Sequence, residues 1–343
     1  MLKSPKNLGV IHFIGIGGIG MSGIAEILFQ SGYNVQGSDI NNSNNTIRLR
    51  KLGIKIFIGQ KKSNIINAKI VVVSTAISEI NKEYIAAKKM FLPIVHRAEM
   101  LGELMRLKQS IAIAGTHGKT TTTSLIAKMI EENGMDPTII NGGIISSLDS
   151  NAKLGNGEWM VVEADESDGS FAKLNPTVAI ITNIDLEHLD YHKSEENLEK
   201  AFFQFVSSIP FYGFVCLCID HPRTQKLISK LQNKKVITYG LSANADIRAT
   251  NISYKDNKMS FLLNIGNLKE HNNKNYKIEF SMIGLHNIQN ALATIAIGIE
   301  LKIPITKIKK TLKTFTGIDR RFQQDRRIKD TCIIDNNRHK PVE

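Results

Sequence analysis

The sequence predicts an α/β fold with parallel sheets, and three observations support this prediction. Short apolar runs that suit buried strands recur along the chain, as at residues 10–14, 111–113 and 178–182. The first two of these runs lead directly into a Gly-rich turn and then into a predicted helix. The chain has 343 residues, more than one domain usually holds. We therefore expect two or three domains of the α/β class.

The first Gly-rich turn follows the apolar strand at residues 10–14. Residues 15–20 are Gly-Ile-Gly-Gly-Ile-Gly, which satisfies the pattern G-x-G-x-x-G, and an amphipathic helix follows. A second strand, predicted at residues 33–37, leads to Asp39, about where a ribose-binding acid lies in dinucleotide-binding folds. Taken alone, these features favour NAD and a dehydrogenase. The same turn can hold any pyrophosphate, so its ligand stays open.

Strands predicted at residues 55–58 and 69–74 extend this first sheet. A helix opens at Arg97 and ends near Lys108. We place the first domain boundary there.

The second Gly-rich turn is Ala-Gly-Thr-His-Gly-Lys-Thr at residues 114–120, between an apolar strand and a predicted helix. Its glycines let backbone N–H groups point into one concavity, the Lys119 ammonium can meet β- and γ-phosphates, and the Thr120 hydroxyl can bind Mg²⁺. The loop is shorter than the usual pattern, because Ile113 stands where the first glycine is expected. The surrounding strand and helix nevertheless predict a phosphate-binding loop rather than an incidental turn.

Acidic residues follow the next apolar strand, predicted at residues 159–162. Four acids lie within residues 163–168. The carboxyl ends of parallel strands open onto the ligand crevice of a sheet, and Mg²⁺ in nucleotide sites takes one or two protein carboxylates. Glu163 or Asp165 is therefore the expected metal partner, with a solvated acidic turn as the alternative.

A histidine among acids, His188, follows the strand predicted at residues 178–182. A single histidine is more often a core or surface residue than a functional one. However, three consecutive strands then deliver Lys119, Glu163 and His188, and a doubly wound sheet brings such strand ends together.

The C-terminal half continues the α/β pattern. Further strands are expected at residues 214–220, 236–240, 258–265 and 276–283, the last two as a β-hairpin. A helix then starts near residue 284 and places Asn287 and Asn290 on one face. Amides there can cap and pack, or they can bind the edge of an adenine ring.

Composition narrows the possible partners. The net charge is +12, but the lysines are scattered and aromatic residues are few, which favours a solvated basic surface over a nucleic-acid platform. Cys216 and Cys218 lie on one side of a predicted strand, and with Cys332 the three cannot all pair, which is typical of a reducing compartment. No leader and no apolar run of ~18 residues is seen, so we expect a cytoplasmic protein without membrane contact.

These motifs together resemble the Mur ligases, the ATP-dependent amino-acid ligases that build the peptidoglycan stem peptide. The matching segments occur in the family's order and cover residues 8 to about 323. They are residues 15–23, 97–101, 114–123 and 163–168, Asn183 with His188, residues 286–290, and Gly317 with Arg320, Arg321 and Phe322. The resemblance implies ATP and Mg²⁺ as cofactors, UDP-N-acetylmuramate and L-alanine as substrates, and an acyl phosphate as the intermediate.

The resemblance also implies a domain plan. Residues 1–108 are expected to form a Rossmann-like UDP-sugar-binding domain and residues 109–317 a P-loop ATPase-like central domain. Residues 318–343 correspond to the start of a third α/β domain that is largely missing. Residues 335–343 only half match the family's pattern, in Asp335, His339, Pro341 and Glu343.

Site residues carry over from the family by position. UDP-sugar binding is expected of Gly15, Gly17, Gly18, Gly20, Met21 and Ser22. ATP binding is expected of Gly115, Thr116, His117, Gly118, Lys119, Thr120, Thr121, Asn287 and Asn290. Metal binding is expected of Thr120, Glu163 and His188, and catalytic roles of Lys119, His188 and Arg321.

Three alternatives stay open beside an active alanine ligase. The changed motif and the missing domain favour a truncated or degrading copy that binds nucleotide with little or no turnover, and an incomplete gene model would look the same. A sibling ligase that acts on a preformed peptide and an NAD-dependent dehydrogenase are the others. The sequence leaves the oligomeric state open.

Overall fold

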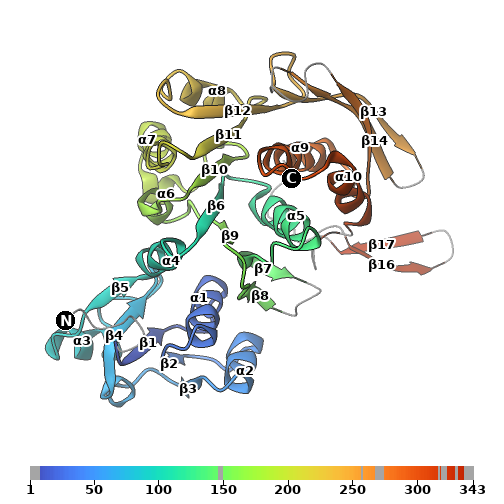
Figure 1. Ribbon diagram of the computed structural model, residues 1–343. Helices are drawn as coiled ribbons and strands as arrows, with labels where there is room; N and C mark the ends of the chain where they lie inside the picture. Colours follow the sequence, from blue (N-terminus) through green and yellow to red (C-terminus); the bar gives the residue numbers. More distant parts are fainter. Residues whose placement is uncertain are drawn as a thin grey trace.

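The computed structural model describes residues 8–145, 150–255, 258–266, 274–315, 317, 323–328 and 331–335. Its strands form a five-stranded sheet, a ten-stranded sheet and a separate antiparallel pair, β16 (Gln323–Ile328) with β17 (Thr331–Asp335). Figure 1 shows the five-stranded sheet and its helices at the N-terminal end of the molecule and the ten-stranded sheet above them. The mixed α/β architecture predicted from the sequence is confirmed.

The first sheet is parallel throughout, in the order β3-β2-β1-β4-β5. Its strands are β1 (Val10–Ile14), β2 (Val35–Asp39), β3 (Lys55–Ile58), β4 (Ala68–Val73) and β5 (Ile94–His96). The connecting helices are α1 (Ile19–Gln30), α2 (Asn44–Lys51), the 3₁₀ helix η2 (Lys62–Ile65), α3 (Lys82–Lys89) and α4 (Arg97–Met105). The strands predicted in this part of the chain are present, and β2 extends to Asp39.

A buried polar network fastens α3 to the first sheet. Glu83 accepts hydrogen bonds from Ser38 Oγ (2.5 Å), Asn64 Nδ2 (2.6 Å) and the Lys61 backbone N–H (3.2 Å), and its Oε2 lies 3.3 Å from His12 Nε2. Burial by itself raises the pKa of Glu83, but the hydrogen bonds from His12, Ser38 and Asn64 outweigh it and hold this pKa below its ordinary value. Glu83 is therefore a carboxylate that the fold keeps ionised.

The second sheet has the order β15-β14-β13-β12-β11-β10-β6-β9-β7-β8. Its strands are β6 (Gln109–Ala114), β7 (Thr138–Ile145), β8 (Ser150–Lys153), β9 (Trp159–Glu163), β10 (Val178–Ile181), β11 (Phe214–Cys218), β12 (Lys235–Gly240), β13 (Ile247–Lys255), β14 (Lys258–Ile265) and β15 (Asn275–Phe280). Parallel pairing connects β7, β9, β6, β10, β11, β12 and β13. Strands β8, β14 and β15 are antiparallel to their neighbours. The predicted hairpin is β14 with β15, and β13 joins it as a third strand that the sequence did not indicate.

Helices cover both faces of the second sheet (Figure 1). They are α5 (Lys119–Glu132), the 3₁₀ helix η3 (Ser170–Lys173), α6 (Leu189–His192), α7 (Glu195–Ser207), α8 (Pro222–Ile228), α9 (Leu285–Glu300) and α10 (Ile305–Thr314). Side chains of β6 alternate between two buried clusters: Ile111 and Ile113 pack with α5 and α9, and Ala112 and Ala114 face the opposite side. This two-residue period places the core on both faces of the sheet.

Cys216 and Cys218 are buried free thiols in the cluster around α5 and α9. Both lie on β11, so the prediction that they share one face as apolar side chains is confirmed. Burial raises the pKa of Cys218 to about 12, and so this thiol stays protonated.

The two sheets meet where α1 packs against β7 and β8. Asn151 on β8 donates a hydrogen bond from Nδ2 to the Ile19 carbonyl of α1 (2.7 Å), and Arg48 on α2 donates to Ser150 Oγ (2.8 Å). A Cβ atom at Gly23 would lie 2.8 Å from Asn151 Nδ2. Glycine at this position therefore allows α1 to approach β8 closely.

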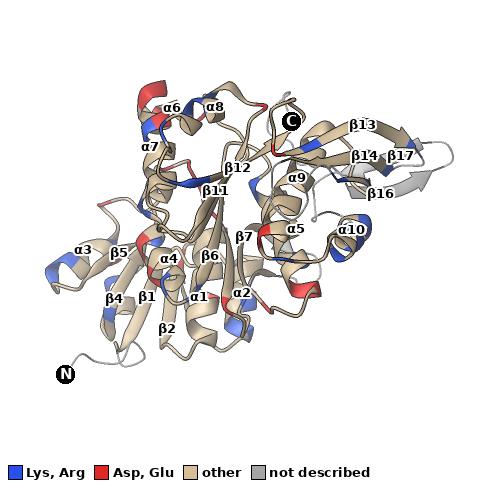
Figure 2. Cartoon of the chain, turned by 45° about the horizontal axis from the view of Figure 1, so that its top comes forward, with Lys and Arg blue, Asp and Glu red and all other residues tan. Residues whose placement is uncertain are grey.

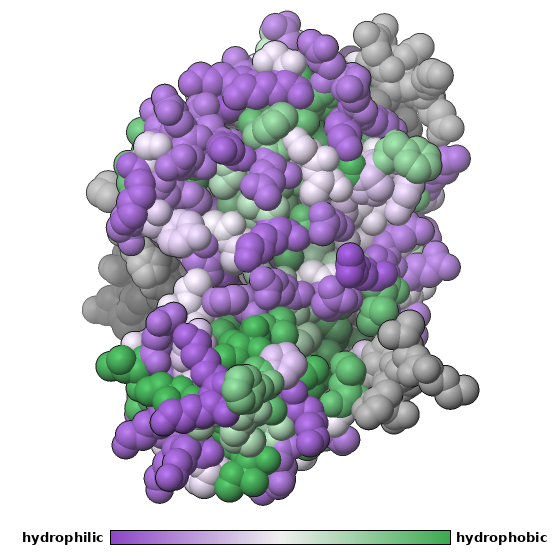
Figure 3. Space-filling view, turned by 90° about the vertical axis from the view of Figure 1, so that its left-hand side faces the viewer, coloured by the Kyte–Doolittle hydropathy of each residue, from purple (hydrophilic) through white to green (hydrophobic). Residues whose placement is uncertain are grey.

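The outer surface is mixed in character. Lys and Arg residues are spread over helices as far apart as α3 and α10 (Figure 2). The face in Figure 3 is mostly hydrophilic in its upper half, and apolar side chains gather in its lower half, over the first sheet and its helices. None of the described helices combines the length and the apolar character needed to cross a membrane.

Candidate active site

The phosphate-loop sequence lies between β6 and α5, as predicted. Gly115 and Gly118 have φ angles of +133° and +81°, which side chains other than glycine rarely adopt. A Cβ atom at Gly115 would lie 2.1 Å from Thr182 Oγ1, so the loop is also packed tightly against the end of β10. No side chain caps the N-terminus of α5 at Gly118. The first N–H groups of α5 are therefore left for a ligand or for water.

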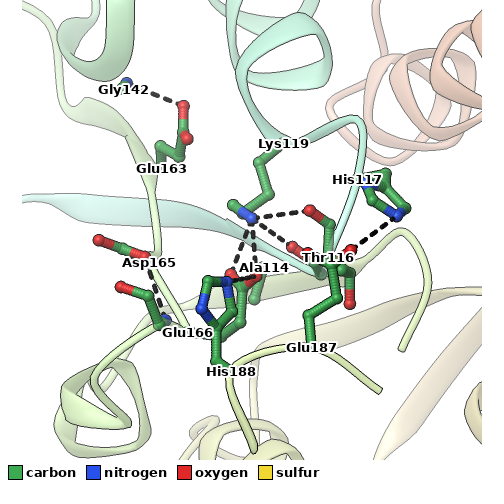
Figure 4. A network of polar contacts seen from close by, with 12 residues as sticks. Ala114, Thr116, His117, Lys119, Gly142, Glu163, Asp165, Glu166, Glu187 and His188 are labelled. Carbon is green, nitrogen blue, oxygen red and sulfur yellow. Dashed lines mark hydrogen bonds and ion pairs between the residues drawn. The ribbon is translucent and has the colours of Figure 1, made fainter. Parts of the chain in front are cut away.

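Lys119 points back over this loop (Figure 4). Its ammonium donates to the carbonyl oxygens of Gly115 (2.6 Å) and Thr116 (3.1 Å) and forms an ion pair with Glu166 at 2.8 Å. The side chain of Glu166 is only 2% exposed. Burial raises the pKa of Glu166 to about 7 despite the neighbouring ammonium. Lys119 is thus held by an acid that is itself poorly solvated.

Glu163 lies at the end of β9, beside the start of α5. Its Oε1 accepts a hydrogen bond from Thr120 Oγ1 (3.2 Å), and its Oε2 accepts one from the Gly142 backbone N–H (2.8 Å). The predicted metal ligands Thr120 and Glu163 are therefore neighbours. Asp165, the other expected metal partner, instead forms an ion pair with Arg97 at 3.1 Å.

His188 is the N-cap residue of the short helix α6, and its backbone has a left-handed conformation with a φ angle of +56°. Its Nε2 lies 3.9 Å from Glu166 Oε1, on the side of Glu166 that faces the loop (Figure 4). His117, on the loop itself, lies 3.5 Å from Asp185 Oδ2 through its Nε2. The two histidines therefore contact different acidic side chains.

Strand order explains why these side chains meet. Strands β9, β6 and β10 are neighbours, with Ile113 paired to Glu163 and Ala114 paired to Ile181. The expectation that three strand ends meet at one edge of a parallel sheet is confirmed. The individual roles of the residues stay predictions.

The two amides of α9 are buried and bonded to their surroundings. Asn290 Oδ1 accepts a hydrogen bond from Thr122 Oγ1 (3.1 Å), and Asn290 Nδ2 donates to Asn287 Oδ1 (3.2 Å). A Cβ atom at Gly118 would lie 2.6 Å from Asn290 Oδ1. These contacts place both amides directly behind the loop, and adenine binding by them stays a prediction.

The first Gly-rich turn is stabilised by the end of β2. The Gly17 N–H donates to Asp39 Oδ2 (2.8 Å), and Gly15 has a φ angle of +78°. Asp39, the acid considered for a ribose, is thus engaged with the turn itself. Among the expected sugar-nucleotide residues, Met21 and Ser22 are buried, and Ser22 Oγ donates to the Ile19 carbonyl (2.9 Å).

An inter-sheet cavity of about 230 Å³ connects the first turn to the acidic strand end. Gly20 at the start of α1 and Arg97 at the start of α4 line one part of it, and Glu163 and Asp165 line another. Most of the remaining wall is apolar, from Ile19, Ile24, Ala98, Leu101, Ile140, Phe171 and Leu174, and Asn141, Gly142 and Ser170 complete it. The cavity therefore joins the two predicted nucleotide sites.

Two residues of this region were not selected individually from the sequence. Glu166 was one of four acids in a run, and only the fold shows that it is buried against Lys119. Arg97 belonged to a matched segment, but its approach to the acids of another domain is a tertiary contact. Arg321, expected at the phosphates, lies outside the described residues.

No group of three or more His, Cys, Asp or Glu side chains in the described ranges is arranged to hold a metal ion. Mg²⁺ at nucleotides needs only one or two protein carboxylates, because phosphate oxygens and water complete its shell. The pair Thr120 and Glu163 suits such a partial site.

Comparison with known proteins places the chain in one family. The Mur ligase middle domain matches residues 113–298, and the Mur ligase family catalytic domain matches residues 10–109. UDP-N-acetylmuramate–L-alanine ligase of Acidiphilium cryptum is 51% identical over the whole chain, which spans 72% of that protein. The corresponding ligase of Rhodospirillum rubrum is 50% identical over the same span and 72% of its own length. The crystal structure of UDP-N-acetylmuramate-alanine ligase from Thermotoga maritima superposes with a TM-score of 0.85 at 29% identity, over 97% of this chain and 75% of that one.

Proposed function

This chain belongs to the Mur ligase family, and we propose that it joins L-alanine to UDP-N-acetylmuramate at the expense of ATP. The observation that supports the proposal most directly is the meeting of Lys119, Glu163 and His188 at adjacent strand ends. Relatives that are 51% and 50% identical over the full chain carry the name of this activity.

The proposed reaction has two steps. The muramate carboxylate attacks the γ-phosphorus of ATP, ADP leaves, and an acyl phosphate forms. The amine of L-alanine then attacks the acyl carbon, phosphate leaves, and the amine gives up a proton. Both steps depend on neutralising phosphate charge and on aligning the reacting groups.

Lys119 and the N-terminus of α5 bind the β- and γ-phosphates in this proposal. The ammonium already lies over the loop, 2.6 Å from the Gly115 carbonyl. A small movement away from Glu166 is therefore enough for it to contact a phosphate bound in the loop. Gly115, Thr116, His117, Gly118 and Thr121 form the walls of the loop, and Asn287 and Asn290 hold the adenine ring. Arg321, which follows Gly317 in the sequence, is proposed as a further phosphate ligand from its match to the family pattern.

Mg²⁺ is the proposed metal, and it neutralises phosphate oxygens when bound. Thr120 Oγ1 and Glu163 Oε1, 3.2 Å apart, are hard oxygen donors that suit it. His188, whose Nε2 lies 3.9 Å from Glu166 Oε1, is the proposed contact of a second ion near the acyl phosphate.

The first Gly-rich turn binds the UDP pyrophosphate rather than NAD in this proposal. Its residues are Gly15, Gly17, Gly18, Gly20, Met21 and Ser22. The start of α1 at Gly18 has no side-chain cap, so its N–H groups suit an anion. Residues 1–108 then act as the sugar-nucleotide domain and residues 109–317 as the ATP domain.

A direct test incubates the purified chain with UDP-N-acetylmuramate, L-alanine and Mg·ATP and detects the amide product by mass spectrometry. We expect product and ADP only when all three are present, and none from Lys119→Ala. Lys128→Ala on the same helix is the matched control. Calorimetric binding of Mg·ADP and UDP-N-acetylmuramate without product would instead favour a non-catalytic nucleotide-binding protein.

Hydrogen exchange tests the ligand of the first turn. UDP-N-acetylmuramate is expected to protect residues 15–23, and NAD is not. Protection by NAD alone would overturn the assignment and favour a dehydrogenase.

A further inference from the structure

A positively charged side chain of the inter-sheet cavity lies beside the first Gly-rich turn. That turn and the first residues of α1, together residues 15–22, contain no Lys or Arg, although the proposed ligand carries a pyrophosphate and a carboxylate. Among the described residues that line the cavity, Arg97 is the one with a positive charge. It belongs to α4, which contacts α1.

The guanidinium of Arg97 lies directly on the first turn of α1. A Cβ atom at Gly20 would be only 2.4 Å from Arg97 Nη1. Glycine at position 20 therefore makes room for the guanidinium. The first N–H groups of α1 and the Arg97 side chain consequently border the same space, where their charges favour an anion together.

Two acids of the central region hold one edge of this guanidinium. Arg97 Nη2 lies 3.1 Å from Asp165 Oδ2 and 3.6 Å from Asp168 Oδ2. Burial alone raises the pKa of Asp165, but the hydrogen bond with Ser167 and the charge of Arg97 hold this pKa below its ordinary value. Nη1 and Nε of Arg97 have no acceptor among the described residues, so these donors are available to a ligand.

We propose that Arg97 binds an anionic oxygen of the sugar nucleotide, and that Asp165 and Asp168 position its guanidinium for this contact. The inference rests on the proposed function, because it takes UDP-N-acetylmuramate as the ligand. Two oxygens of that ligand have the required charge: those of the pyrophosphate, near the start of α1, and those of the muramate carboxylate, on the way to Glu163. Arginine is suited to both, because it can donate two parallel hydrogen bonds.

Binding calorimetry on the full chain without ATP separates these two sources. UDP-N-acetylmuramate and UDP-N-acetylglucosamine share the pyrophosphate, but only the first has the carboxylate. Arg97→Met is compared with Arg106→Met, which removes an exposed arginine at the other end of α4. We expect Arg97→Met to weaken UDP-N-acetylmuramate binding roughly 10- to 100-fold, the loss typical of a charge-assisted contact.

The pattern of loss identifies the oxygen. Equal loss for both sugar nucleotides places Arg97 on the pyrophosphate, and loss for UDP-N-acetylmuramate alone places it on the carboxylate. Arg97→Lys is expected to recover part of the affinity, because it restores the charge without the forked geometry. Mg·ADP affinity should stay unchanged in every Arg97 variant, and this shows that the variants are folded.

Two results would contradict the inference, and they have different consequences for the proposed function. If the parent protein binds UDP-N-acetylmuramate and Arg97→Met binds it equally well, Arg97 has no contact with the ligand and only this inference fails. If the parent protein does not bind UDP-N-acetylmuramate at all, the proposed function fails and the inference fails with it.

Discussion

Lys119 and Glu166 form an ion pair at 2.8 Å inside the candidate ATP site, with the glutamate almost completely buried. The ammonium also donates to two loop carbonyls, so its three protons are all engaged. A bound phosphate therefore competes with Glu166 for Lys119. The ion pair holds the lysine near its working position while it opposes the arrival of further negative charge.

Glu166→Gln should tighten the binding of metal-free ADP by roughly three- to tenfold, because it removes a negative charge that competes for Lys119. Calorimetry in the presence of a chelator measures this affinity. Glu199→Gln is the control, since Glu199 pairs with Lys226 on the outer helices at 3.1 Å. Unchanged or weaker ADP binding by Glu166→Gln would show that Glu166 does not oppose the nucleotide.

Lys119→Ala should weaken the binding of Mg·ADP at least about tenfold, because a charge-assisted contact to phosphate is lost. It also leaves buried Glu166 without a cation, and so the free energy of unfolding should fall by about 1–3 kcal/mol above neutral pH. Lys128→Ala, on the same helix, removes an ion pair with Glu132 at 3.7 Å and a hydrogen bond to the Thr314 carbonyl at 3.3 Å, and it should leave the affinity for Mg·ADP unchanged. Equal ADP affinity in the two variants would remove Lys119 from the phosphate site.

Glu163→Gln should raise the Mg²⁺ concentration needed for tight ADP binding, because an amide is a weaker ligand than a carboxylate for Mg²⁺. The amide oxygen can still accept from Gly142 or Thr120, so the fold is preserved. Asp165→Asn is the sharpest control, since Asp165 pairs with Arg97 instead. If the Mg²⁺ titration shifts in Asp165→Asn and not in Glu163→Gln, then Asp165 is the metal ligand and Glu163 is not.

Gly23→Ala and Gly102→Ala should have opposite effects, although both glycines lie inside helices. A Cβ atom at Gly23 would lie 2.8 Å from the buried Asn151 Nδ2, whereas a Cβ atom at Gly102 would lie 3.9 Å from Leu174 Cδ2, an ordinary van der Waals contact. We expect Gly23→Ala to lower the free energy of unfolding by about 1–3 kcal/mol and Gly102→Ala to raise it by about 0.5–1 kcal/mol. Urea denaturation measures both, and stabilisation by Gly23→Ala would show that α1 and β8 are not in tight contact.

Glu83 should contribute acid-sensitive stability. Its pKa in the folded chain lies below the ordinary value of 4.5, so its contribution is complete above that value and is lost as the pH falls through the lower, folded-state pKa. The parent protein should therefore lose more stability than Glu83→Gln between about pH 6 and about pH 3. Exposed Glu79, 3.7 Å from Lys88, provides the control Glu79→Gln. Parallel pH profiles for Glu83→Gln and the parent would exclude this linkage.

Local patterns predicted the parts of the fold that depend on neighbours in sequence. The apolar runs of β1, β6 and β10, and the glycines that follow the first two of them, predict their structure from a few neighbouring residues. The meeting of Lys119, Glu163 and His188 could also be predicted, because parallel strands align their carboxyl ends at one edge. That inference needed only the direction of the strands.

Contacts between distant segments could not be predicted in this way. The pairing of Glu83 with His12 spans 71 positions, and no local periodicity encodes it. Asp39 matched a ribose-binding position by spacing, yet its carboxylate accepts the N–H of Gly17. In both cases the identity of the residue was visible in the sequence, but its partner depends on how strands and helices pack.

The contact of Asn151 with α1 fixes where the first Gly-rich turn lies relative to the second in this structure. Because Gly23 lets α1 rest directly on β8, a rotation of the first sheet away from the second would have to break the hydrogen bond from Asn151 to the Ile19 carbonyl. If the two turns bind the ligands proposed above, the sugar nucleotide has to span the space between them. A shorter acid bound at the first turn would then not reach the γ-phosphate.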